Sequence, residues 1–162
     1  MAVTTLNVTA GSQAIVTLGN TAVMAAPGGT NGLALPTVQD VTVNAGTQSV
    51  RYSTLDSSAS SAFTTVNENE ITMNLLVDED AFFGNSSLST NPVAQLGLLT
   101  TSINKTEIEF SVAFSGSAAG NFYISGKGFI AGLSPTASVD QAIWQTPCQI
   151  IVNGELTKGT TS

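Results

Sequence analysis

Polar and apolar residues alternate in two segments of this 162-residue chain, and no other feature of the sequence constrains the fold as much. Successive side chains of a β-strand point to opposite faces, so a period of two predicts a strand with one face on a core and one face in water. The side chains predicted to share the core face are Ile71, Met73, Leu75 and Val77 in Glu68–Val77, and Thr106, Ile108, Phe110, Val112 and Phe114 in Lys105–Phe114.

Shorter runs rich in β-branched residues predict further strands, separated by residues typical of turns. These predicted strands are Val3–Thr9, Gln13–Leu18, Thr37–Val43, Thr47–Ser53, Asn121–Ala131 and Pro147–Thr157. Residues 1–36 carry no charge and are predicted to form a hairpin and a loop. A turn is expected at Asn44–Gly46, a glycine bulge or bend at Gly126–Gly128, and a loop over residues 132–138.

One helix is predicted, at Pro92–Ser102. Thr90 or Asn91 can cap it, and proline suits the first helical position. Its apolar stripe would consist of Val93, Leu96 and Leu99, while Gly97 weakens the helix. The sequence therefore predicts a single domain over residues 1–162 that is mainly β, a β-sandwich or small barrel with one flanking α-helix packed on it.

The charge composition restricts the possible partners. Charged residues make up 9% of the chain and the net charge is −7. The four cations, Arg51, Lys105, Lys127 and Lys158, are scattered, whereas tight binding of a nucleic-acid backbone requires clustered cations. No run approaches the ~18 apolar residues of a membrane-spanning helix, and Met1–Gly11 has no secretory pattern, so synthesis in a reducing cytoplasm is expected.

Residues for catalysis are scarce. The chain has no histidine, which excludes Ser-His-Asp and Cys-His nucleophiles and the commonest metal ligand. Its one cysteine, Cys148, lies in a strand-like run and is expected to be a buried structural thiol. Asp78–Asp80 could bind a calcium ion or could be a solvated strand end, and the strand end is favoured because the segment lacks the glycine and distant glutamate of a calcium loop. We expect no enzyme activity, no catalytic or metal site and no cofactor.

Two pairs of glutamates, Glu68 with Glu70 and Glu107 with Glu109, lie at i, i+2 on the polar faces of the two alternating segments. They could in principle be the paired carboxylates of a glycosidase, but the chain has few aromatic or basic residues to build a sugar cleft. They could simply lie on the solvent-exposed face of a sheet. Alternatively, both strands present their polar faces to one enclosed aqueous surface, where an acidic wall would repel a phosphate backbone.

Residues 54–67 form a segment of a different kind. Their middle, Ser57–Ala62, is small and polar, and the apolar side chains Leu55 and Phe63 lie at its two ends. Two interpretations stay open, a plain surface loop and an interaction loop that becomes ordered against a neighbouring subunit.

The order of these features resembles that of the tail tube (major tail) proteins of long-tailed bacteriophages. Val50–Asp56 leads through the Ser/Ala-rich loop into Glu68–Val77 and the acidic Asp78–Asp80. The helix is followed directly by Glu107–Phe114. Gly126–Leu133 then precedes Asp140, Trp144 and a closing strand to Gly154. The resemblance covers about residues 37–157.

The resemblance implies a structural virion protein that forms hexameric rings, stacked into a tube around a tape measure protein, with tail tip and terminator proteins at its ends. Hairpins of neighbouring subunits would join into one β-barrel lining a lumen through which DNA passes. Glu68, Glu70, Glu107 and Glu109 would then face the lumen, and residues 54–67 would reach the next ring through Leu55, Asp56 and Phe63. The implied location is the virion tail, assembled in the host cytoplasm.

Other functions remain open beside this resemblance. The alternatives are another virion protein, such as a capsid decoration or tail terminator protein, and a β-sandwich binding module for glycans or a host surface. A binding module predicts a monomer with an exposed aromatic strip, and a decoration protein predicts a compact particle that never forms rods.

Overall fold

A computed structural model describes residues 14–19, 32–35, 37–53, 60–87, 92–116, 118–138 and 140–161. In chain order, the elements are β1 (Ile15–Gly19), β2 (Leu33–Ala34), β3 (Val38–Tyr52), β4 (Ser61–Leu76), α1 (Glu79–Phe83), α2 (Pro92–Ile103), β5 (Glu107–Ala113), β6 (Phe122–Ala131), β7 (Thr136–Ser138), β8 (Gln141–Val152) and β9 (Thr157–Thr160). The predicted strand Val3–Thr9 and the loop after β1 lie outside the described residues.

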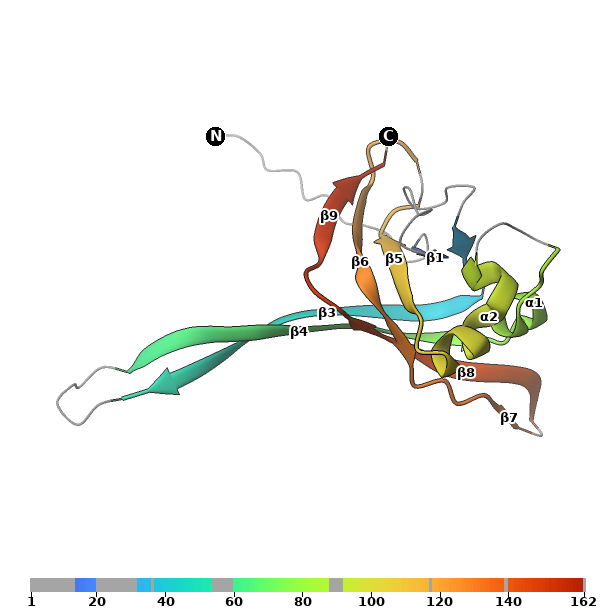
Figure 1. The fold of residues 1–162 in the computed structure, drawn as a ribbon, viewed down its shortest axis with the longest axis horizontal. Coiled ribbons are helices and arrows are strands. Elements are labelled where there is room, and N and C mark those ends of the chain that lie inside the picture. The colour runs from blue at the N-terminus through green and yellow to red at the C-terminus, as the bar shows by residue number, and fades with distance from the viewer. Residues whose placement is uncertain are drawn as a thin grey trace.

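The strands form one antiparallel sheet in the order β2-β1-β5-β6-β8-β4-β3, with β7 beside β8 and β9 beside β6. Strand β6 pairs with β5 over residues 123–129, with β9 over residues 122–125 and with β8 over residues 128–131. Strands β5, β6 and β9 therefore run across β3, β4 and β8, and both helices lie at one end of the molecule (Figure 1). The prediction of a mainly β fold with a flanking helix is confirmed. Among the described strands the sheet is open rather than a closed barrel.

The core lies on one face of β4, β5 and β8, where the alternation predicted it. Buried apolar side chains come from five strands and both helices: Val16, Leu18, Ile71, Met73, Leu75, Phe82, Val93, Leu98, Ile108, Phe110, Val112, Ile130, Cys148 and Ile150. Two parts of the prediction are wrong: Ser111 and Ala113 are buried as well, and Thr106 and Phe114, predicted on the core face, are exposed. Thr17, the partner of Ser111 on β1, is covered by the chain at Gly32, so this part of β5 is buried on both faces.

Strand β3 is continuous, so the predicted turn at Asn44–Gly46 is wrong. All three residues pair with β4, and the side-chain amide of Asn44 donates to Oε1 of Glu70 at 2.9 Å. Residues that usually favour turns are held in a strand because β4 offers a partner for the whole length of β3.

The helical layer contains a second, short helix where the sequence predicted a strand end and a loop. Asp78 caps α1, because its side chain accepts a hydrogen bond from the Ala81 N–H at 3.0 Å. This carboxylate therefore stabilises the first turn of a helix. The C-terminal part also differs from the prediction. Residues 136–138 form β7 instead of a loop, β8 begins at Gln141, and β9 is a separate strand after the Gly154 turn.

The glycines of β6 do not form the predicted bulge, since the register with β5 is unbroken from Glu107 to Ala113. Gly126 instead lies opposite Phe110, and a Cβ built on it would come 2.9 Å from the phenyl Cζ. A Cβ on Gly128 would meet the backbone of Ile151 in β8. The two glycines therefore leave room for a core ring and for the approach of the neighbouring strand.

Candidate assembly surfaces

The β3–β4 hairpin projects from the body as a two-stranded arm (Figure 1). Strand β8 pairs with β4 over Glu70–Leu76, and no other described strand pairs with β4 beyond Glu70 except β3. Among the described residues, 45–52 and 61–69 therefore form a ribbon paired only with itself. A two-stranded ribbon alone is marginally stable in water, so a binding surface for the arm would stabilise it.

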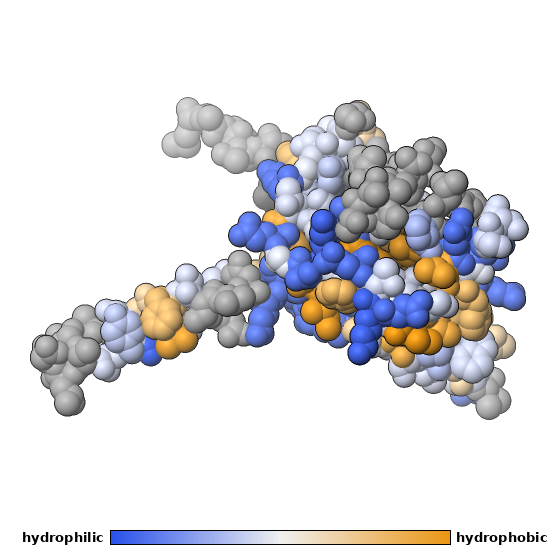
Figure 2. Space-filling model, viewed as in Figure 1, coloured by the Kyte–Doolittle hydropathy of each residue, from blue (hydrophilic) through white to orange (hydrophobic). Residues whose placement is uncertain are grey.

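The end of the arm is aromatic. Tyr52 and Phe63 pack across the two strands with ring centroids 6.1 Å apart, yet 52% and 53% of their surfaces are exposed. Val50, the partner of Phe63, is 45% exposed, and Arg51 lies between Val50 and Tyr52. We call these four residues the arm end. Figure 2 shows hydrophobic surface near the tip of the arm, apart from the body.

The predicted loop over residues 54–67 is wrong in its second half, because β4 begins at Ser61. Phe63 therefore belongs to a strand and is held in place by its pairing with β3. The predicted contact residues Leu55 and Asp56 lie outside the described residues.

The register places all four glutamates on one face of the sheet. Directly paired residues point to the same face, and the pairs run from Glu107 through Phe129 and Ile151 to Glu70. Glu68 and Glu109 lie two residues along their strands from Glu70 and Glu107, so they share this acidic face. The sequence predicted the pairs, but only the pairing of β6 with β8 brings them together.

Neutral amides hold three carboxylates on the acidic face. Asn153 Nδ2 donates to Glu107 at 2.6 Å, Asn74 Nδ2 donates to both oxygens of Asp40 at 2.8 and 3.1 Å, and Glu70 accepts from Asn44 and from the Gln149 side chain. An amide donor fixes a carboxylate without cancelling its charge. This face therefore combines ordered side chains with retained negative charge. Lys127, opposite Glu109, adds one cation.

Helices α1 and α2 meet at two glycines with positive φ, Gly84 and Gly97. A Cβ on either would collide with the backbone of the other helix. Gly97 also kinks α2, so the predicted apolar stripe is wrong for Leu96, which is 39% exposed. Val93 is buried and Leu99 is half-buried against the core.

The outside of these helices carries a second exposed apolar surface. Phe83 is 59% exposed, and its backbone adjoins that of Leu96 across the glycine contact. Glu79 lies four residues before Phe83, so the two side chains share a face of α1. We call Glu79, Phe83 and Leu96 the helical patch. The sequence does not predict this patch, because a regular helix would place Leu96 on the apolar stripe with Val93, whereas α2 is non-helical at Gly97.

Few side chains in the described part of the chain could act as nucleophiles or bind a metal ion. Burial raises the pKa of the Cys148 thiol to about 12, which makes it a poor nucleophile. The described residues contain no cluster of three or more metal-ligating side chains. No helix among them has the length and hydropathy needed to cross a bilayer.

The fold is similar to that of chains in gene transfer agent particles and in a contractile injection system. A chain from the tail of an empty gene transfer agent particle with C6 symmetry aligns over 96% of this chain and 100% of that chain, with a TM-score of 0.62 and 12% identity. A chain from the virion of a native gene transfer agent aligns over 96% and 100%, at 0.61 and 10%. A chain of the sheath-tube complex of an extracellular contractile injection system aligns over 92% and 89%, at 0.58 and 10%. No protein-family model or curated protein matches the sequence.

Proposed function

We propose that this protein is the tube subunit of a phage-like tail, a structural protein without catalytic activity that assembles with copies of itself. The observation that carries the proposal is the likeness of fold over nearly the full length of both chains, with proteins whose particles are tails or tube complexes. The arm supports it independently, because this ribbon lacks a partner surface within the described part of its own chain.

In the assembly that we propose, hexameric rings stack into a hollow tube and the acidic face lines the lumen. A tape measure protein would occupy this lumen during assembly in the host cytoplasm, and tip and terminator proteins would close the two ends. DNA would later pass through the virion tail. Carboxylates held by neutral amides suit that role, because they repel phosphates. The cation that this face carries, Lys127, lies directly opposite the carboxylate of Glu109.

Electron microscopy of the purified protein over a concentration series tests the assembly. We expect rings or hollow rods with a central channel above a threshold concentration. Monomers at every concentration, even with tail-tip components added as nuclei, would contradict the proposal and favour a binding module. Compact particles that bind capsids and never form rods would favour a decoration protein.

Reversing charge on the acidic face tests the lumen assignment. Rods of Glu68→Lys/Glu107→Lys are expected to form, because Glu68 is exposed and Glu107 half-buried in the isolated chain. They should retain a labelled single-stranded oligonucleotide on sedimentation at low salt and release it at high salt, whereas wild-type rods should retain almost none. The matched control, Glu79→Lys/Asp140→Lys, reverses two exposed acids, one on α1 and one in the turn before β8. Equal retention by the control would refute the lumen assignment.

A further inference from the structure

The turn between β8 and β9 begins with the dipeptide Asn153-Gly154. Asn153 is exposed, and its backbone N–H donates to the carbonyl oxygen of Lys127 at 2.7 Å. Gly154 has a φ of 100°, and a Cβ built on it would meet no atom of the described residues within 4 Å. The backbone at Asn153 is therefore held against β6, while the backbone of Gly154 lies in open space.

An asparagine followed by glycine can lose its side-chain amide, because glycine has no side chain to hinder attack by its own peptide nitrogen. Here the peptide nitrogen of Gly154 would form a bond to Cγ of Asn153. Its proton would pass to the side-chain nitrogen, and the bond between Cγ and Nδ2 would break with release of ammonia. Water would then open the succinimide ring to give aspartate or isoaspartate. No electrons are transferred, and water is the one co-reactant.

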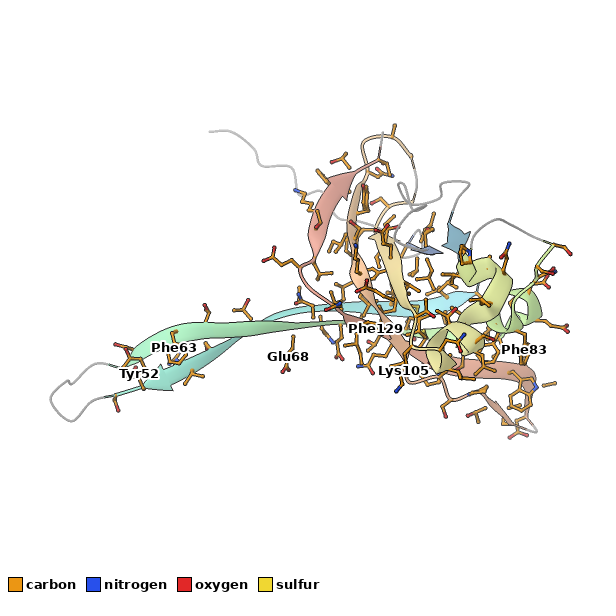
Figure 3. The ribbon with its side chains drawn as sticks, in the orientation of Figure 1. Tyr52, Phe63, Glu68, Phe83, Lys105 and Phe129 are labelled. Carbon is orange, nitrogen blue, oxygen red and sulfur yellow. The ribbon has the colours of Figure 1, made fainter. Side chains whose placement is uncertain are left out.

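On the acidic face, Glu107 restrains this side chain. Nδ2 of Asn153 donates to Oε1 of Glu107 at 2.6 Å, and hydrogen bonds to a charged acceptor are the stronger kind. Phe129, the β6 partner of Glu107, marks the place near the crossing of β6 with β4 (Figure 3). The hydrogen bond limits the side-chain rotation that ring closure requires. Attack at Cγ also builds negative charge on Oδ1, which the neighbouring carboxylate opposes. Both effects slow the loss of the amide.

We propose that Asn153 is a site of spontaneous deamidation whose rate is set by Glu107. The product carboxylate would lie beside that of Glu107 and would add one negative charge to a chain whose net charge is already −7. Isoaspartate would also lengthen the main chain by one carbon in the turn that positions β9. The chemistry lies within one subunit and needs no assembly. In the proposed tube, the acidic face would become more negative as particles age.

Peptide mapping by mass spectrometry tests the proposal, with folded samples aged at mildly alkaline pH and digested with pepsin at acidic pH to stop further reaction. Glu107→Ala should accelerate deamidation at position 153 about 10-fold or more, the effect of losing one hydrogen bond to a charged group. Glu107→Gln keeps an acceptor oxygen and should stay within about 3-fold of the wild-type rate. The second Asn-Gly pair, Asn31-Gly32, is the internal reference, and its rate should be the same in all three proteins.

Equal rates at position 153 in the wild-type protein and Glu107→Ala would overturn the proposal. So would modification of Asn153 in urea with none in any folded variant. Acceleration of both Asn-Gly pairs in Glu107→Ala would indicate general unfolding, and Glu107→Asp then decides, because its carboxylate is one methylene too short to reach Nδ2. Acceleration at position 153 alone in that variant supports the restraint, and the wild-type rate overturns it. Rod formation enters none of these measurements, so their failure leaves the tube proposal standing.

Discussion

Replacing Tyr52 and Phe63 together by serine is expected to abolish rod formation at concentrations where the wild-type protein assembles. More than half of the surface of each residue is exposed, and within the described part of the chain each ring contacts no ring but the other, so the body should fold unchanged. Buried aromatic anchors typically contribute about 2 kcal/mol or more each to an interface. Losing two would cost about 4 kcal/mol per contact and raise the threshold concentration about 1,000-fold.

The measurement combines electron microscopy with thermal unfolding of the unassembled protein. The matched control is Tyr52→Phe/Phe63→Tyr, which keeps both rings and should assemble near the wild-type threshold. Rods of the serine variant at the wild-type concentration would show that the arm end is not an anchor. A lowered melting temperature of the monomer would instead mean that the rings stabilise the fold itself.

The local pattern of the sequence was sufficient to predict the strands that face the core. Ile71, Met73 and Leu75 are buried as the alternation of β4 predicts, and Ile108, Phe110 and Val112 are buried in the same way. A period of two is a local property, so it can be read without knowing the partner strand. The mainly β class follows from the same pattern, and the flanking helix was predicted from Pro92 at its first position and from helical spacing.

The arm and the acidic face depend on pairing between strands that are distant in the sequence. The residue pattern within a single segment therefore could not predict them. Asn44–Gly46 has the composition of a turn but lies in a strand, because β4 pairs with it. Glu70 and Glu107 come to one face only through Phe129 and Ile151 on two later strands. A long arm and a shared acidic face are therefore consequences of register, which no single segment contains.

In the helical layer, two residues, Asp78 and Gly97, have roles that differ from those predicted from the sequence. The sequence favours a strand end at Asp78, yet an acidic residue three positions before Ala81 also matches a helix cap. Gly97 was expected to weaken a helix. Its positive φ instead lets α2 kink against Gly84, and this kink exposes Leu96. A glycine whose role is close backbone approach cannot be told from a merely unfavourable one without the neighbouring chain.

Phe110→Ala is expected to cause the largest loss of folding stability among single core substitutions. Phe110 is fully buried, and it is the largest of the fully buried side chains. Removing such a ring typically costs about 3–5 kcal/mol, a large part of the 5–15 kcal/mol by which domains are usually stable. Urea unfolding followed by circular dichroism measures the loss. Phe122→Ala, which truncates a ring that is 56% exposed, is the matched control and should cost about 1 kcal/mol or less.

A double-mutant cycle with Gly126 shows whether the loss arises from the contact between the ring and this glycine. In the wild-type protein, Gly126→Ala places a methyl group 2.9 Å from Phe110 Cζ and should destabilise the fold by about 1–3 kcal/mol. In the Phe110→Ala background the ring is gone, so the same methyl enters the vacated space and should cost little or stabilise the fold. The two substitutions are therefore expected to deviate from additivity by at least about 1 kcal/mol. Additive losses would mean that β6 shifts to accept the methyl group, and that the glycine at position 126 is not required by the core ring.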